Sequence, residues 1–383
     1  MIVATAALMV MPMLLLASNA SGVPPGRLWT VMVYIDADNN LEPFGVANLE
    51  QLETVGSTSQ VAFVALIDTF SGPATLNYVE KGQSMVLGEW GEVNMADPGT
   101  MSKFIKTAEK AYPAQNYAFI SWDHGGGWRG LNWDDTSELQ GIEPSFMDMN
   151  VLRTAVVDAG VRFDVFAFDQ CLMAQPEVAY QVQGYADYLV FSEETIYGQG
   201  FPYDMLAADI VAAPGMDAKG MSVTMVENFA EYYNSITWAN DWTISAFDMS
   251  SMDSLTAGVT HLASASLNAL STYRSQFKND LAGTDNYYYP YFHDLKGYAM
   301  NLVSDKAILD KSVKDAASEV VSALEDGIVI AMNSKHNIDS YGMSIYFPGA
   351  KNSYLGLKSG YADVPFAVDT GWLAFLMAFG TNK

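Results

Sequence analysis

Residues Phe163 to Met173 read FDVFAFDQCLM, a stretch that decides the fold and contains the chain's only cysteine, Cys171. Residues Asn116 to Gly130 read NYAFISWDHGGGWRG and follow the same pattern. Both begin as short apolar runs of strand type and break into polar or glycine-rich sequence at their carboxyl ends. Open α/β sheets place their reacting groups at the carboxyl ends of parallel strands. We therefore expect the thiol of Cys171 and the imidazole of His124 to act at one site.

The rest of the chain alternates between strand-like and helix-like segments, which predicts an α/β fold with a mainly parallel sheet covered by helices on both faces. Further strands are predicted at 29–36, 61–68, 186–194, 242–250 and 341–349, with a hairpin over 74–93 that turns at Lys81-Gly82. Helices are predicted at 41–55, 97–111, 149–159, 175–183, 217–235, 253–273, 305–326 and 372–379. A loop is predicted at 195–203, and residues 131–144 form a polar segment without helical periodicity. A boundary is placed near residue 213, with the alternative that late strands such as 341–349 return to the first sheet.

The composition limits the classes of partner. The chain has 383 residues and a formal net charge of −25, from 44 acidic and 19 basic side chains. Such acidity argues against binding to nucleic acid or to an anionic membrane surface, and it favours a cationic substrate. A single cysteine allows no intramolecular disulfide.

The amino terminus has the pattern of a targeting segment. Residues 1–20 read MIVATAALMVMPMLLLASNA and end in small residues that suit cleavage of a signal peptide. No basic residue precedes Arg27, so an uncleaved anchor is the alternative. Residues 21–27 form a short linker.

Cys171 has two interpretations. A lone cysteine is most often a buried, inert thiol. This one lies where an apolar run breaks, next to Asp169 and Gln170, and His124 precedes it by 47 residues, close to the spacing of about 50 found in caspases. An imidazole near the sulfur can accept its proton and later protonate the leaving amine, which is the chemistry of a cysteine nucleophile.

The glycines after His124 admit three interpretations. Gly125, Gly127 and Gly130 match G-x-G-x-x-G, but a poor helix sequence follows them, so a dinucleotide site is weakly supported. HGGG is also typical of esterase oxyanion loops, but the chain lacks the G-x-S-x-G that would supply a serine. The third interpretation is a backbone that lets a substrate carbonyl approach and offers amide hydrogens to an oxyanion.

The sequence contains no recognisable metal motif. The remaining histidines, His261, His293 and His336, occur without H-E-x-x-H or a Cys/His cluster, which argues against zinc. The acidic pairs Asp134-Asp135 and Glu193-Glu194 could help to bind calcium, but they match no EF-hand, and we expect solvated loops there. Tyrosines 287–289 and 291 fit a recognition surface and ordinary packing equally well.

Three motifs in order, WTVMVYIDADNNLE, ISWDHGGGWRG and FDQCLMAQPEVAY, resemble the clostripain family of cysteine peptidases, relatives of caspases. The resemblance covers residues 28–379. It implies a caspase-like three-layer α/β sandwich and hydrolysis of peptide bonds through a thioester, without a cofactor in the chemistry. By position, Cys171 is the nucleophile and His124 the general acid/base, and the backbone amides of Gly125 and Cys171 stabilise the oxyanion. Calcium dependence is known in the family, so a structural or activating role of calcium stays open.

The resemblance also implies a substrate pocket. Asp169, Glu194 and Gln199 are its candidate residues, and a carboxylate near the scissile bond agrees with the family's preference for Arg or Lys at P1. Gln199 stands where relatives often have an acid, so a less strict preference is expected. Residues 131–152 contain no Lys or Arg, which argues against self-processing there.

We therefore expect a secreted or cell-surface, monomeric cysteine endopeptidase with a caspase-like core at 28–213. Residues 214–383 would pack on this core or extend it. Its partners would be peptide or protein substrates, with no nucleic acid and no stable membrane association after signal removal. The alternatives are a catalytically silent caspase-like protein that binds peptides and, with less support, a nucleotide-binding α/β protein.

Overall fold

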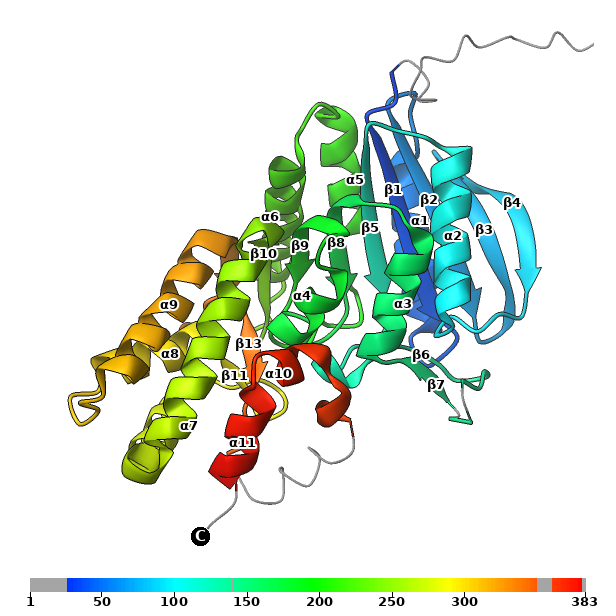
Figure 1. Cartoon of the computed structure of the whole chain (residues 1–383). Coiled ribbons are helices and arrows are strands. Elements are labelled where there is room, and N and C mark those ends of the chain that lie inside the picture. Colours follow the sequence, from blue (N-terminus) through cyan, green and yellow to red (C-terminus); the bar gives the residue numbers. More distant parts are fainter. Residues whose placement is uncertain (1–25, 140, 143, 350–359, 381–383) are drawn as a thin grey trace, which may run out of the picture.

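The computed structural model describes residues 26–139, 141–142, 144–349 and 360–380. The predicted signal peptide at 1–20 and most of the linker at 21–27 lie outside these residues. The described part is built around a nine-stranded sheet with the strand order β12-β10-β9-β8-β5-β1-β2-β3-β4 (Figure 1). Among the described residues, no helix combines the length and the apolar character needed to cross a membrane.

The strands of this sheet are β1 Trp29–Ala37, β2 Val61–Thr69, β3 Gly72–Glu80, β4 Gln83–Gly91, β5 Asn116–Trp122, β8 Phe163–Asp169, β9 Ala186–Phe191, β10 Thr243–Asp248 and β12 Ile328–Asn333. Two small antiparallel sheets pair β6 Leu131–Asp134 with β7 Ser145–Met147, and β11 Phe292–Asp294 with β13 Ser344–Tyr346. The helices are α1 Glu42–Val55, α2 Pro98–Ala111, α3 Met149–Ala159, α4 Pro176–Val182, α5 Tyr203–Ala212, α6 Ala218–Ser235, α7 Met252–Ala282, α8 Leu295–Ser304, α9 Lys311–Gly327, α10 Pro365–Asp369 and α11 Trp372–Gly380. The described part also contains single turns of 3-10 helix, namely η1 Gly127–Arg129, η2 Met249–Ser251 and η4 Tyr361–Asp363.

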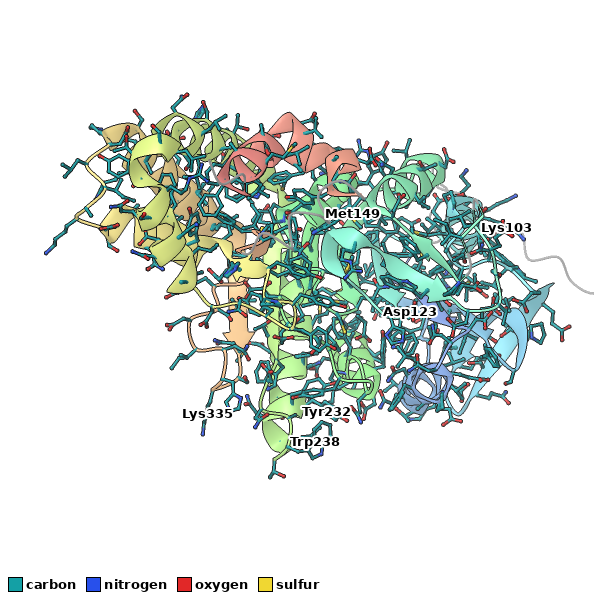
Figure 2. All side chains as sticks on the ribbon, turned by 90° about the horizontal axis from the view of Figure 1, so that it is seen from below. Lys103, Asp123, Met149, Tyr232, Trp238 and Lys335 are labelled. Atoms are coloured by element: carbon teal, nitrogen blue, oxygen red, sulfur yellow. The ribbon has the colours of Figure 1, made fainter. Side chains whose placement is uncertain are left out.

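The middle of the sheet is parallel and its two edges are antiparallel. Strands β9, β8, β5, β1 and β2 run in one direction, while β10 and β12 extend one edge and β3 and β4 the other. Trp122 on β5 pairs in register with Asp169 on β8. His124 and Cys171 each lie two residues beyond this pair, so the register brings both to the same edge of the sheet. Figure 2 shows the molecule from the side of this edge, with Asp123, the neighbour of His124, labelled.

Apolar side chains on the two faces of the sheet form two separate cores. On one face, Met32 and Tyr34 of β1 pack in a core with α2, α3, α4 and the elements from α7 onward. On the other face, Val33 and Ile35 of the same strand pack with α1, α5 and α6. Alternate residues of β1 therefore serve opposite cores, which explains the continuous apolar run WTVMVYI and gives the three-layer arrangement.

The predicted strands and helices of the first two hundred residues are all present, and most differences lie later in the chain. Residues 341–349 do not return to the main sheet: β13 pairs with β11 instead. The strands after residue 213 that do extend the main sheet are β10, which was predicted, and β12, which was not. The polar segment at 131–144, which lacks helical periodicity, contains β6. Residues 203–212 and 295–304 form α5 and α8, neither of which was predicted.

Aspartate caps fix where several helices begin. Asp97 accepts a hydrogen bond from the backbone N–H of Gly99 and starts α2 at the predicted place. The helix predicted from Asp305 begins only at Lys311, because Asp310 is the residue that caps Ser312 and Val313. Helix α7 continues to Ala282, but non-helical backbone at Tyr273 interrupts it where the predicted helix ends.

Candidate active site

His124 and Cys171 line one pocket at the carboxyl edge of the parallel strands. The pocket has a volume of about 190 Å³. Its lining residues are Leu41, Trp122, Asp123, His124, Asp169, Cys171, Ile196, Tyr197, Gly198 and Gly200. The lining comes from the ends of β5 and β8, the loop after β1 and the loop before α5. The predicted thiol and imidazole therefore share one cavity.

The imidazole of His124 is oriented by the loop after β1. Its Nε2 atom lies 2.8 Å from Oδ1 of Asn40. An amide oxygen can only accept, so this contact favours the tautomer with the proton on Nε2 and leaves Nδ1 able to accept a proton. Burial lowers the pKa of His124, and the charge of Asp135 offsets this effect only in part. The ring is therefore neutral at neutral pH.

The sulfur of Cys171 contacts the backbone of Ile196. The N–H of Ile196 donates to Sγ at 3.3 Å, and Sγ lies 3.6 Å from the carbonyl oxygen of Ile196. Burial raises the pKa of the thiol to about 11, the charges of Asp169 and Glu194 add to this, and the N–H groups of Ile196 and Gly125 oppose it. The resting sulfur is therefore a protonated thiol that needs a base before it can attack.

Gly125 occupies a position that no larger residue fits. A Cβ atom there would lie 2.4 Å from the carbonyl oxygen of Cys171 and 2.9 Å from its nitrogen. The backbones of the two motifs are thus in close contact. The next glycines serve packing: Gly127, with φ 62°, lies against the side chain of Gln175, whose Oε1 accepts from the N–H of Trp128 at 2.9 Å.

The segment after the glycines is not the helix of a dinucleotide site. The chain continues through the single turn η1 directly into strand β6. Nucleotide-binding motifs of the G-x-G-x-x-G type need a helix at this point, because its amino terminus holds the pyrophosphate. The structure therefore gives the dinucleotide interpretation no support.

Asp169 forms the polar wall of the pocket. Its Oδ2 accepts hydrogen bonds from the N–H of Phe201 at 2.9 Å and the hydroxyl of Tyr203 at 3.0 Å. Its Oδ1 is buried and has no hydrogen-bond partner among the described residues. Burial raises the pKa of this carboxyl to about 7, against the lowering effect of these two donors. A cationic group entering the pocket would supply the missing partner of Oδ1.

Glu194 and Gln199, the other two predicted pocket residues, are outside the lining of this cavity. The carboxylate of Glu194 accepts from the backbone N–H groups of Thr195 and Tyr288, which ties it to its own loop and to a distant segment. Gln199 offers its backbone carbonyl to the side chain of Asn48 at 2.9 Å. Both residues therefore support the loop behind the pocket.

The sequence analysis did not single out several residues of the site. Asn40 and Ile196 position the imidazole and the sulfur, and Tyr203 holds Asp169. Asn40 follows the apolar run of β1 just as His124 follows that of β5, so the rule that polar groups collect at strand ends would have found it. Ile196 acts through its backbone and leaves no signal in the sequence.

The acidic pairs were expected to lie in solvated loops, and this expectation is wrong for three of their four members. Asp134, Glu193 and Glu194 are buried. Glu193 accepts from the hydroxyl of Tyr287 at 2.8 Å and from the N–H of Gly342 at 2.9 Å, so it joins two distant segments. Carboxylates with such partners are structural groups of the interior.

The other singled-out side chains have local partners. His261 lies 2.5 Å from a carboxylate oxygen of Glu319 on the surface. His293 is buried, which lowers its pKa to about 4. Tyr289 and Tyr291 stack on each other at 5.2 Å, and the hydroxyl of Tyr291 accepts from Arg129. Packing accounts for most of the tyrosine cluster.

The chain is similar to a known protein family and to solved structures. The model of the clostripain family matches residues 33–377. Clostripain of Hathewaya histolytica is 26% identical over 405 residues, which cover 85% of this chain and 75% of that protein. An inactive zymogen C11 protease from Parabacteroides distasonis superposes with a TM-score of 0.69 at 22% identity, covering 91% of this chain and 99% of that one. A secreted C11 cysteine protease from Bacteroides thetaiotaomicron, in complex with an irreversible peptide inhibitor, also superposes with a TM-score of 0.69. It is 21% identical, and the match covers 90% of this chain and 99% of that one.

The two solved structures confirm the predicted fold, a caspase-like α/β sandwich with a mainly parallel central sheet. The family match extends over most of the chain and includes both the His124 and the Cys171 motifs. This protein therefore belongs to the clostripain family and is a cysteine-type endopeptidase.

Proposed function

We propose that the enzyme hydrolyses peptide bonds on the carboxyl side of Arg or Lys, with Cys171 as nucleophile and His124 as general acid/base. One observation carries the proposal: Asp169 lines the pocket that contains both residues, and its buried Oδ1 has no hydrogen-bond partner within the described part of the chain. A guanidinium or ammonium group at P1 would pair with this oxygen. The net charge of −25 favours the approach of cationic peptides.

The first half of the reaction forms a thioester. Nδ1 of His124 takes the thiol proton while Asn40 holds Nε2, and Sγ attacks the carbonyl carbon of the scissile bond. The oxyanion accepts hydrogen bonds from the backbone N–H groups of Gly125 and Cys171. His124 then gives its proton to the leaving amine, the C–N bond breaks, and the acyl group stays on the sulfur.

The second half hydrolyses the thioester. His124, now neutral again, takes a proton from a water molecule, whose oxygen attacks the thioester carbonyl. The C–S bond breaks, the sulfur regains its proton from His124, and the peptide acid leaves. Every proton is accounted for by His124 and water, so no cofactor enters the chemistry.

The alternative is a protein that binds peptides without turnover. The observation in its favour is the raised pKa of Cys171, whose sulfur contacts the backbone of Ile196 in the resting state. A peptide carrying Arg and an electrophilic group distinguishes the two. A peptidase is labelled at Cys171 much faster by the Arg compound than by its Leu counterpart, whereas a silent protein is labelled equally slowly by both.

The direct test is hydrolysis of fluorogenic peptides with Arg, Lys, Asn, Asp or Leu at P1, compared with the Cys171→Ala variant. We expect turnover after Arg and Lys that falls at least a thousandfold in the variant. Asp169→Asn should weaken cleavage after Arg or Lys more than Gln199→Asn does, because only Asp169 lines the pocket. Equal effects of the two substitutions would contradict the assignment of Asp169, and turnover that survives in Cys171→Ala would contradict that of the nucleophile.

Several properties of the whole protein belong to the same proposal. We infer a secreted or cell-surface monomer whose segment 1–20 is removed, with residues 28–213 as the catalytic core and residues 214–383 extending it. Calcium is proposed as a structural or activating ion outside the chemistry. Self-processing between the two motifs is not expected, because the two flanking arginines are held: Arg129 by Tyr291, and Arg153 by the carbonyl groups of Gln181 and Gln183.

A further inference from the structure

Exposed aromatic residues gather beside the active site. In the described part of the chain, the aromatic residues that are more than half exposed are Phe70, Trp238 and Tyr288, at 58%, 55% and 67%. Two of them, Trp238 and Tyr288, belong to loops that contact the segment 194–197 next to Cys171. Single exposed apolar residues need no explanation, but exposed aromatic residues that gather at one site indicate binding.

Trp238 lies next to a wall of the active-site pocket. It belongs to the loop between α6 and β10 and is labelled at the end of α6 in Figure 2. Its ring packs edge-on against that of Tyr197, with 5.1 Å between the ring centroids, and Tyr197 lines the pocket. The hydroxyl of Tyr197 also accepts a hydrogen bond from the N–H of Asp241 at 3.2 Å, so two contacts join this loop to the pocket. The indole of Trp238 thus extends the aromatic wall beyond the pocket.

The turn that carries Trp238 is anchored on the protein. The next residue, Ala239, is buried, and its N–H donates to the carbonyl group of Ile236 at 3.1 Å. Trp242, just before β10, is buried as well. An ordered turn therefore presents the exposed indole. An aromatic side chain that is already in place loses little conformational entropy when a ligand covers it.

Tyr288 approaches the same segment from the other face of the sheet. Its backbone N–H donates to the carboxylate of Glu194 at 2.9 Å, and its ring packs on that of Tyr289, with 4.9 Å between the centroids. Tyr289 packs against the core that contains α2, α3 and α4, whereas Tyr197 packs against the core of α1, α5 and α6. The segment that begins at Glu194 is thus flanked by aromatic rings from both faces.

The order of the strands indicates which part of a substrate crosses this segment. In the sheet, β8 with Cys171 after its end lies between β5, which is followed by His124, and β9, which is followed by Glu194. His124 has to reach the leaving amine to protonate it, so the substrate residues after the scissile bond lie on the side of β5. The residues before the bond, which stay on the sulfur, extend towards β9 and β10. This step rests on the proposed roles of His124 and Cys171.

The chemistry of the segment favours apolar side chains over acidic ones. Burial raises the pKa of Glu194, and the charge of Asp241 adds to this effect, so two carboxyl groups lie close to each other here. An acidic side chain of the substrate would be repelled by them. A large apolar or aromatic side chain would instead cover the exposed rings of Trp238 and Tyr288, and it would gain from the buried area and from contact between rings.

We propose that Trp238 and Tyr288 form the walls of a subsite for P2, the substrate residue before P1, and that this subsite takes a large apolar or aromatic side chain. The position is P2 because Tyr197 serves both places: its ring lines the pocket for the P1 side chain and contacts Trp238. Trp238 is therefore a specificity-determining residue of the peptidase.

The first test identifies the residues on both sides of the cleaved bonds. A denatured protein extract is cut after Glu, which leaves Arg and Lys inside the peptides, and the mixture is then digested with the enzyme and analysed by mass spectrometry. We expect large apolar and aromatic residues at P2 at least about fivefold more often than in the mixture, and Asp less often. The same data give the P1 residue, so a failure of the proposed Arg/Lys preference is distinguishable from a failure at P2.

The second test compares two peptides that differ only at P2, with Phe in one and Gly in the other, and that carry the P1 residue found in the digest. For the parent, kcat/KM should be at least about tenfold higher for the Phe peptide. Trp238→Ala should reduce this ratio to below about threefold, Tyr288→Ala should reduce it in part, and Trp238→Phe should keep most of it. Damage to the pocket itself lowers the rates of both peptides and cancels in the ratio.

Phe70→Ala is the matched control. Phe70 is as exposed as Trp238, but it follows β2, which lies on the far side of β5 from β9. Its Phe/Gly ratio should equal that of the parent. An unchanged ratio in Trp238→Ala, an equal loss in Phe70→Ala, or a selection confined to P3 would each overturn the proposal. Selection at P2 without a preference for Arg or Lys at P1 would count against the proposed function alone.

Discussion

Asp169 and Cys171 are two residues apart and influence each other electrostatically. Burial raises the pKa of both groups, to about 7 for the carboxyl and about 11 for the thiol, and the charge of Asp169 adds to the effect on Cys171. A basic P1 side chain paired with Asp169 would offset that charge. The substrate that fits the pocket would therefore also make the thiol easier to deprotonate, which links specificity to activation of the nucleophile.

The titration of Asp169 predicts how specificity depends on pH. The carboxyl is ionised above its pKa of about 7 and neutral below it, so its attraction for a cationic P1 group is lost as the pH falls. We expect the ratio of kcat/KM for an Arg peptide to that for a Leu peptide to fall about tenfold between pH 8 and pH 5.5. The titration of His124 and Cys171 affects the cleavage of both peptides alike, so it cancels in the ratio.

The control for this measurement is Asp169→Asn, in which no charge can be lost. Its Arg/Leu ratio should be low and should stay constant across the same range. A ratio that falls with pH in the variant as it does in the parent would show that another group is responsible.

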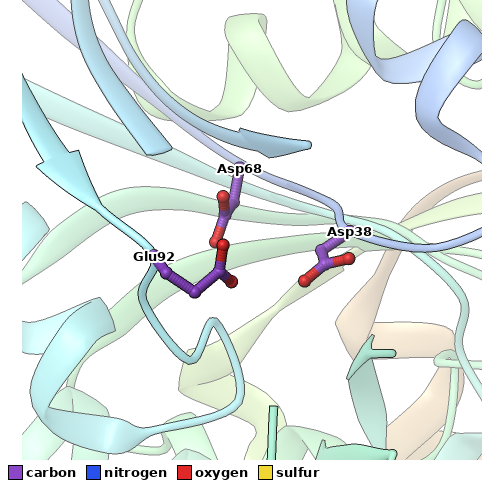
Figure 3. Close-up of side chains that lie close together, drawn as sticks. All are labelled: Asp38, Asp68 and Glu92. Atoms are coloured by element: carbon purple, nitrogen blue, oxygen red, sulfur yellow. The ribbon is translucent and has the colours of Figure 1, made fainter. Parts of the chain in front are cut away.

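At the scale of elements, the sequence predicts those parts of the site that depend on the pattern of a single strand. The apolar runs that break at His124 and Cys171 indicate both the strands and their edge of the sheet, because parallel strands share that edge. Contacts between distant segments leave no such pattern. The strand-end rule places Asn40 at this edge but does not predict its contact with His124, 84 residues away. Glu92 approaches Asp38 and Asp68 only because the β3–β4 hairpin folds back (Figure 3).

Strand β12 was missed for a related reason. Its six residues, IVIAMN, directly follow α9 at Gly327, without the loop that usually separates two elements. The junction is possible because residue 327 has no side chain. A Cβ atom on Gly327 would lie 2.3 Å from Cε2 of Phe247 on the neighbouring strand β10. The glycine therefore lets the end of the helix approach the sheet that β12 extends.

This close approach predicts the effect of Gly327→Ala. The added methyl group overlaps with the ring of Phe247, and the free energy of unfolding should fall by about 1–3 kcal/mol, the usual cost of overpacking. The midpoint of urea unfolding of the Cys171→Ala chain measures the change. Gly215→Ala is the matched control, since no heavy atom lies within 4 Å of its Cβ position, and it should change stability by less than about 0.5 kcal/mol. A similar loss in both variants would mean that glycine flexibility, and not contact with Phe247, governs the result.

At the scale of the whole molecule, buried carboxylates connect the catalytic half to the later segments. Glu193 beside the site accepts from Gly342, and Glu177 in α4 accepts from the N–H of Tyr346 at 3.1 Å and the hydroxyl of Tyr361 at 2.7 Å. Strands β10 and β12 complete the same sheet. The regions before and after residue 213 thus share a sheet, two cores and buried hydrogen bonds, so they are expected to unfold together.

Glu177 makes this connection sensitive to pH. Burial raises its pKa from 4.5 to about 7, despite the hydrogen bonds from Tyr361 and Tyr346, so the folded chain keeps a proton there that the unfolded chain releases between these values. The stability contributed by that proton is present below pH 4.5 and is lost as the pH rises through about 7.

The variant Glu177→Gln has no group at this position that can titrate. Its free energy of unfolding, relative to that of the parent, should therefore increase by about 3 kcal/mol between pH 4.5 and pH 8. Urea unfolding of both proteins in the Cys171→Ala background at the two pH values measures this difference. If the difference in free energy of unfolding between the two proteins stays constant with pH, Glu177 is ionised at both pH values, and the prediction is wrong.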